Sequence, residues 1–147
     1  MPIWKILFIS IMLAASYGAA SADWRFRSDA GPGATYFEGG RMVGLRIECA
    51  GGEPSLVFFG EGWDLQPDMT YSVVALVDDT AFVLPSKVRR RGGERDLVHR
   101  ADWKETAPLI QALMAGKNVE ISTPLGRYTL PLKGSSAALK ALRAACR

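Results

Sequence analysis

The two cysteines of this 147-residue chain, Cys49 and Cys146, constrain its fold more than any other feature of the sequence. Only one pairing is possible, and a disulfide would tie the C-terminal segment to an early strand. In the chain-entropy model, a closed loop of about 100 residues contributes roughly 4–5 kcal/mol of stability. Two free thiols are the alternative. Metal ligation is disfavoured, because the chain has no Cys-x-x-Cys pair and a single histidine.

The first 22 residues predict a secretory signal peptide. An early lysine precedes the apolar run Ile6–Ala15, and Ala20-Ser21-Ala22 has the small-x-small pattern of a cleavage site. The apolar run is too short to span a bilayer comfortably, although an uncleaved anchor is the alternative. Cleavage after Ala22 would leave residues 23–147 as a single β-rich domain, periplasmic or secreted, where disulfides form. No later apolar run predicts a transmembrane segment.

Short stretches of alternating polar and apolar residues predict β-strands through the middle of the chain. The strand Met42–Cys49 places Cys49 on its apolar face and should pair with residues 55–60. Met69–Val77 carries strong β-formers on both faces, which predicts a central strand buried on both sides. A return strand should follow it and end before Pro85.

The closing segment predicts helix, hairpin and helix in succession. Residues 108–115 have helical spacing, and residues 119–132 alternate around a Pro-Leu-Gly turn. Pro131 cannot donate to a strand ladder and suggests an edge position. Ser135 is a candidate N-cap for a last helix that runs into Cys146 with an apolar stripe. The whole pattern predicts a mainly β protein: an antiparallel β-sandwich or partly open barrel with two short helices, the last one C-terminal.

A basic segment around Gly92-Gly93 is the most distinctive polar feature. Its cationic residues are Lys87, Arg89, Arg90, Arg91 and Arg95. As a loop, this segment could contact lipid phosphate, an acidic polysaccharide or an acidic protein, because arginine makes bidentate contacts with such groups. A solvated, flexible hairpin tip is the alternative. Trp63 and Trp103 are the two aromatic residues with a possible role in ligand contact.

The sequence contains few candidates for catalytic residues. His99 lies near Asp102 and Glu105 in sequence and could do acid–base work, but a surface histidine on a strand is the simpler interpretation. No activated nucleophile is evident, so no catalytic residue, metal site or cofactor is predicted. The formal net charge is only +3, with one lysine in the predicted signal peptide, which does not favour nucleic acid as a partner.

Four features of the chain can be considered together: the predicted signal peptide, Trp24, a strand cysteine at Cys49 and the closing third of the chain. The closing residues concerned are Leu109, Ile110, Leu113, Gly116, Val119, Ile121, Leu130, Pro131, Leu132, Lys133, Gly134, Ser135, Ala138, Leu139, Leu142 and Cys146. This layout resembles the invasion-associated locus B family of small exported bacterial proteins. The resemblance implies a periplasmic or surface-associated, non-enzymatic, β-rich protein.

The leading hypothesis is therefore a non-catalytic exported protein that uses the basic segment to contact an anionic envelope component or a protein partner. A small envelope hydrolase using His99 with a nearby carboxylate is one alternative. A structural or assembly factor, which recruits a partner through an exposed edge strand, is the other.

Overall fold

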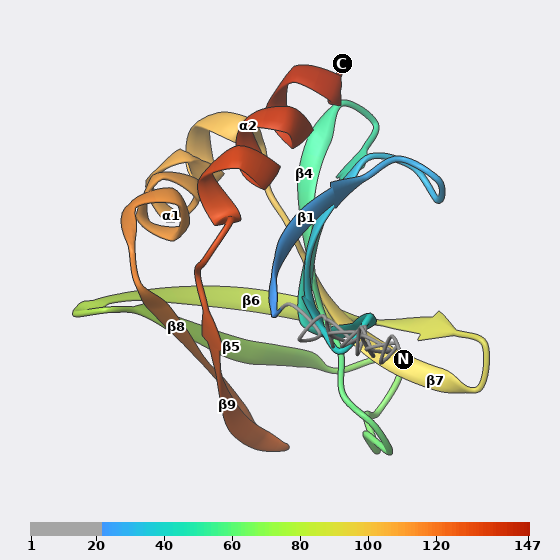
Figure 1. Ribbon diagram of the computed structural model, residues 1–147. Coiled ribbons are helices and arrows are strands. Elements are labelled where there is room, and N and C mark those ends of the chain that lie inside the picture. Colours follow the sequence, from blue (N-terminus) through green and yellow to red (C-terminus); the bar gives the residue numbers. More distant parts are fainter. Residues whose placement is uncertain (1–21) are drawn as a thin grey trace, which may run out of the picture.

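The computed structural model describes residues 22–147, which form one antiparallel sheet and two helices (Figure 1). The strands are β1 (Asp23–Arg27), β2 (Gly33–Glu38), β3 (Arg41–Ala50), β4 (Glu53–Phe58), β5 (Thr70–Val77), β6 (Thr80–Arg91), β7 (Glu94–Arg100), β8 (Asn118–Thr123) and β9 (Gly126–Pro131). The helices are α1 (Trp103–Ala115) and α2 (Ser135–Ala145). The predicted signal peptide falls on residues that, apart from Ala22, lie outside this range.

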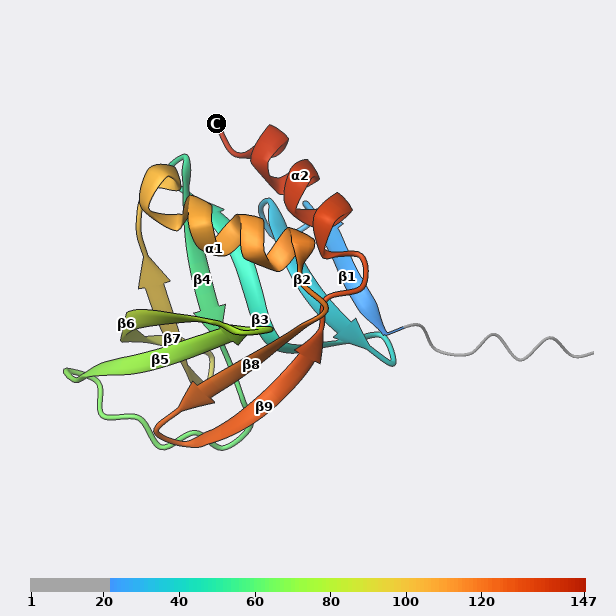
Figure 2. The ribbon, with the colours of Figure 1, turned by 90° about the vertical axis from the view of Figure 1, so that its left-hand side faces the viewer.

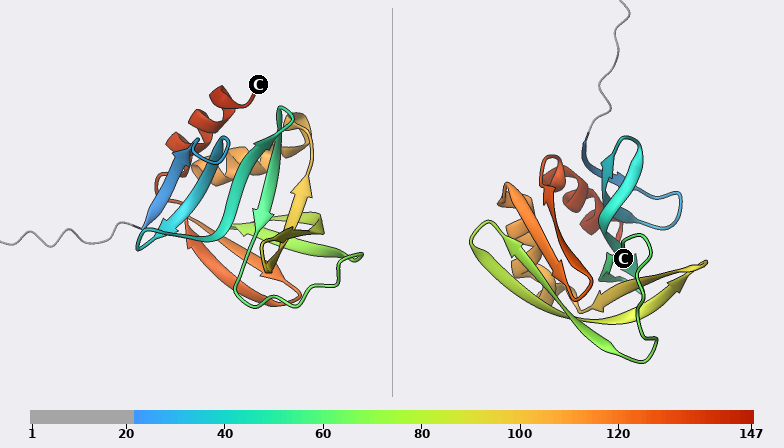
Figure 3. Two further views of the ribbon diagram at one scale, coloured as in Figure 1. Left: turned by 90° about the vertical axis from the view of Figure 1, so that its right-hand side faces the viewer. Right: turned by 90° about the horizontal axis from the view of Figure 1, so that it is seen from below.

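The nine strands found in residues 22–147 belong to one hydrogen-bonded sheet, in the order β1-β2-β3-β4-β7-β6-β5-β8-β9. Figure 3, in the view from below, shows this sheet curving around the helices, and Figure 2 shows α1 and α2 side by side on its inner side. The prediction of a mainly antiparallel β protein with two helices, the last one C-terminal, is confirmed. Of the two architectures expected, the partly open barrel describes this single curved sheet and the two-sheet sandwich does not.

The core lies between the inner face of the sheet and the two helices. Leu113 of α1 and Leu142 of α2 are fully buried there, together with Phe58 of β4. Both helices place their apolar stripe on this side, as the spacing of leucines predicts. Burying a side chain of this size stabilises the fold by about 1.5–3 kcal/mol relative to leaving it exposed.

The two edge strands of the sheet meet at Trp24. Its backbone N–H donates to the carbonyl of Lys133, and its indole Nε1 donates to the carbonyl of Pro131, each over 2.9 Å. Pro131 belongs to the edge strand β9, as its missing N–H predicts. Trp24 therefore joins β1 to the residues at the end of β9.

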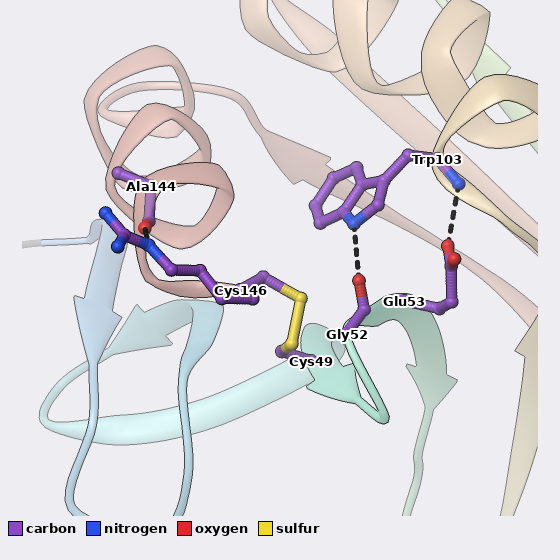
Figure 4. The surroundings of a disulfide bond; sticks show 7 residues. Cys49, Gly52, Glu53, Trp103, Ala144 and Cys146 are labelled. Carbon is purple, nitrogen blue, oxygen red and sulfur yellow. Dashed lines mark hydrogen bonds between the residues drawn. A yellow bond between two sulfur atoms is a disulfide. The ribbon is translucent and has the colours of Figure 1, made fainter.

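The disulfide between Cys49 and Cys146 is present, so this prediction is confirmed. It links β3 to the end of α2 across 97 positions of sequence, with the two Cα atoms 5.5 Å apart (Figure 4). Cys49 lies on the apolar face of β3 and Cys146 follows the buried stripe of α2, as the periodicity of both segments predicts. The last helix is therefore held to the sheet both by packing and covalently.

Ser135 does not cap α2, contrary to the sequence prediction. The cap position belongs to Gly134, which has a φ of 83°, and the Ser135 hydroxyl instead donates to the carbonyl of Leu113 over 2.7 Å. Ser135 is only 1% exposed. A buried hydroxyl needs a partner, and the end of α1 supplies one.

Two predictions about the middle strands are also wrong. β6 does not end before Pro85 but continues to Arg91, for a total of 12 residues. Because β6 pairs with β7 only from Lys87 onward, Pro85 has a neighbouring strand on one side only, where a proline is tolerated. β5 does lie between two strands, but Ser72 on its outer face is exposed, so β5 is buried on one face. The helices cover only the inner side of the sheet.

Gly44 marks the point where β3 contacts β9, which adds to the contact of β1 with the end of β9 at Trp24. The φ of Gly44 is 72°, and a Cβ there would lie 2.5 Å from Cε2 of Tyr128. The Tyr128 hydroxyl donates to the Gly44 carbonyl over 2.7 Å, and burial raises the pKa of this phenol above its usual range. The close approach of the ring thus requires glycine at this position.

Gly44→Ala should lower the free energy of unfolding by about 2 kcal/mol, from the left-handed backbone and the contact with Tyr128 together. Chemical denaturation measures this change. Gly39→Ala is the matched control, because Gly39 has a φ of 58° with nothing within 4 Å of its Cβ position. Equal losses in the two variants would contradict a role for the Tyr128 contact.

Candidate functional site

An open groove of about 1020 Å³ lies on the surface of the described chain. It is bounded by β3, the segment after β4, the β6–β7 hairpin and β9. Arg46 contributes to it from the face of β3 opposite to the core residues Leu45 and Ile47. The groove therefore includes the outer face of the sheet, away from the helices, and we call it the outer groove.

Carboxylates anchor the arginines of the outer groove. Arg89 of β6 pairs with Glu48 of β3, and the same carboxylate accepts from Nε of Arg46 over 3.3 Å. The side chains of Arg46 and Glu48 are mostly buried, at 13% and 20% exposed. Partly buried ion pairs of this kind are screened less by solvent and salt than exposed ones. They hold the guanidinium groups of β3 and β6 in place on the outer face of the sheet.

A second anchor is fully buried. Asp96 of β7 is 0% exposed, and its Oδ2 accepts from Nε of Arg91 over 2.9 Å. The guanidinium of Arg91 lies over the ring of Phe59, 5.7 Å from its centroid. The other carboxylate oxygen of Asp96, Oδ1, is buried and has no hydrogen-bond partner among residues 22–147. A buried acceptor without a partner is uncommon in folded proteins and calls for a donor.

Several donors of these anchored arginines remain free. Within residues 22–147, Arg89 uses only Nη1 and Arg91 uses only Nε in hydrogen bonds. A guanidinium carries five N–H donors in a rigid fork. Arg89 and Arg91 therefore present unused donors at the groove while their positions stay fixed by Glu48 and Asp96.

The basic segment is not a loop, contrary to the sequence prediction. It is a hairpin of β6 and β7 joined by Gly92 and Gly93, so its cationic side chains alternate between two faces of the sheet. Lys87, Arg89 and Arg91 share the outer face. Arg90 and Arg95, which lie opposite each other in the register, point to the other face.

The cations outside the groove have different surroundings. Arg95 donates to the carbonyl of Leu65 over 2.5 Å and so helps to hold the segment between β4 and β5. Lys87 and Arg90 are exposed and make no hydrogen bond or ion pair within the described residues. The predicted set of five therefore divides into two anchored groove residues, one structural residue and two solvated ones.

Of the two candidate tryptophans, only Trp63 lies at the outer groove. Its indole packs over Gly60, where a Cβ would come within 2.3 Å of Nε1. Trp103 lies near the disulfide and donates from Nε1 to the Gly52 carbonyl over 2.8 Å (Figure 4). The guanidinium of Arg143 covers its ring, 4.2 Å from the centroid. Trp103 has a structural role, and the structure brings Trp63 alone together with the arginines.

His99 is not paired with either candidate carboxylate. Its Nδ1 lies 2.7 Å from the carbonyl of Pro85. Asp102 instead caps α1, accepting from the backbone N–H of Glu105 over 2.7 Å. In the described part of the chain, no group of three or more His, Cys, Asp or Glu residues is arranged to hold a metal ion. Neither helix among these residues has the length and apolar character needed to cross a membrane.

Sequence reasoning missed Arg46, Glu48, Phe59 and Asp96. The alternation of β3 already indicates that Arg46 and Glu48 share its polar face. What the sequence does not indicate is that β4 pairs with β7, which brings the polar face of β3 close to that of β6.

Comparisons with protein-family models, curated proteins and solved structures give no match. The resemblance to the invasion-associated locus B family therefore stays a prediction. The class of protein defined by the fold is a small, disulfide-linked, mainly antiparallel β protein with an arginine-lined groove on its sheet.

Proposed function

We propose that this chain is a non-catalytic exported binding protein, periplasmic or secreted, whose outer groove contacts an anionic component of the cell envelope. The observation that carries the proposal is the pair Arg89 and Arg91, each anchored by a carboxylate and each with unused N–H donors. The disulfide supports export, because such bonds persist in oxidising compartments.

The anchors explain how a partly exposed pair of arginines, Arg89 and Arg91, can bind with specificity. A free arginine loses side-chain entropy when it binds, on the order of 1–2 kcal/mol. Glu48 and Asp96 already restrict Arg89 and Arg91, so less freedom is lost when an anion arrives. The remaining donors suit the two oxygens of a carboxylate or phosphate.

Replacing both groove arginines, Arg89→Gln with Arg91→Gln, should weaken sedimentation with a bacterial envelope fraction by about tenfold, because charge-assisted contacts at the groove are lost. At position 91, the glutamine amide nitrogen corresponds to the arginine Nε and can still donate to Asp96, which limits structural damage. The measurement is the bound fraction against protein concentration, at low and at physiological salt. Thermal unfolding of each variant checks the fold.

The matched control is Lys87→Gln with Arg90→Gln, which removes the same charge from two exposed residues of the same hairpin. We expect a change of less than about twofold, since exposed charges act mainly through the screened, long-range field. Equal weakening in both double variants would mean non-specific attraction, and no weakening in either would reject the outer groove as the contact.

A further inference from the structure

The lining of the outer groove restricts the kind of anion that fits it. Four arginines are matched there by four acidic residues. The acidic residues are Glu38, Glu61, Glu94 and Asp96. A densely charged anion would meet repulsion from these carboxylates, which offsets its attraction to the arginines. The balance suits a ligand whose negative charges are separated by neutral polar groups.

Asp96 adds a requirement for a hydrogen-bond donor. Its Oδ1 is buried at the groove and accepts from no protein group within the described residues. An ionised carboxylate only accepts hydrogen bonds, so the complementary group is an O–H or N–H donor, and a hydroxyl supplies one without adding charge. A hydroxyl can reach a recessed oxygen through one bridging water, which is nearly as favourable as direct contact.

Trp63 adds an amphipathic surface. Its indole is half-buried, and within residues 22–147 its Nε1 donates to no protein acceptor. A tryptophan in this state offers an apolar ring face and a free N–H side by side. The ring of a sugar has the matching combination of C–H faces and hydroxyl edges.

We propose that the outer groove binds an acidic saccharide, a chain of hydroxyl-bearing rings with separated carboxylates. This inference rests on the proposed function and names its ligand class. The saccharide's carboxylate meets Arg89 and Arg91, its hydroxyls supply the donor at Asp96, and a ring face packs on Trp63. Phosphate-rich polymers and anionic lipid surfaces lack this combination.

The test is titration of the exported, disulfide-linked protein with four probes: oligogalacturonate, its methyl ester, inorganic polyphosphate and phosphatidylglycerol vesicles. Oligogalacturonate should bind most tightly. Methyl esterification, which keeps the rings and removes the charge, should weaken binding by about tenfold, and polyphosphate should bind at least about tenfold more weakly than oligogalacturonate.

Variants separate ring recognition from charge recognition. Trp63→Leu should weaken oligogalacturonate and its methyl ester by the same factor, whereas Arg91→Gln should weaken only the acid form. Asp96→Asn, which keeps the shape of the side chain, is a second groove variant and should weaken both forms. Arg90→Gln, on the opposite face of the hairpin, is the control and should change neither.

The outcomes distinguish the two proposals. Tighter binding of polyphosphate or vesicles, lost in Arg89→Gln with Arg91→Gln, would overturn the saccharide inference and leave the anion-binding function standing. Absence of oligogalacturonate binding would also overturn the saccharide inference. Binding of every probe that is insensitive to the Arg89 and Arg91 substitutions would overturn both.

Discussion

Loss of the Cys49–Cys146 disulfide should lower the free energy of unfolding by about 2–5 kcal/mol. The bond spans 97 positions of sequence, so the unfolded chain gains much conformational freedom when it is removed. Cys146 is only 8% exposed, and its loss also weakens the packing of the last helix. Chemical denaturation of the double variant Cys49→Ala with Cys146→Ala measures the effect.

Reductant provides the control for this prediction. Added to the natural chain, it should reproduce most of the loss of stability seen in the double variant. Added to the variant itself, it should change nothing. A double variant as stable as the natural chain would mean that packing alone holds α2 on the sheet.

Trp24→Ala should lower the free energy of unfolding by about 3–5 kcal/mol, the usual range for removing a large buried aromatic residue. Trp24 is 3% exposed and packs against the core beside Tyr36. It also holds the two edges of the sheet together through the Pro131 carbonyl. The midpoint of chemical denaturation, with its slope, measures the change.

Trp24→Phe tests the hydrogen bond separately. Phenylalanine keeps most of the apolar contact but cannot donate to the Pro131 carbonyl, so we expect a smaller loss than in Trp24→Ala. Phe26→Ala, at a half-buried position of the same strand, should also cost less. If Phe26→Ala were as damaging as Trp24→Ala, the proposed closure of the sheet at Trp24 would be wrong.

Local patterns predicted most of the individual strands. The alternation in β3 placed Cys49 on its apolar face, and Pro131 indicated an edge strand, because both depend on short-range geometry. Pro85 misled the prediction of β6, since whether a proline ends a strand depends on which sides of that strand are paired. Ser135 misled the prediction of the α2 cap, since the partner of its hydroxyl lies on α1.

The candidate site was predicted only in part. Trp63 and the basic hairpin were identified from composition, but Gly92-Gly93 suggested a loop where the chain makes a tight turn between strands. Because the segment is a hairpin of two strands, Arg89 and Arg91 lie on one face of the sheet and Arg90 lies on the other. The pairing of Arg89 with Glu48, 41 positions earlier, depends on the sheet order and could not be read from spacing.

The last helix is covalently joined to the sheet by the Cys49–Cys146 disulfide, and we propose that the domain held in this way is exported. Intact-mass analysis tests it most directly, on protein recovered from the bacterial envelope after expression of the full sequence and treatment with a thiol-alkylating reagent. We predict a chain that begins at Asp23 and carries no alkyl label. A chain that retains residues 1–22 and is labelled at both Cys49 and Cys146 would contradict the account.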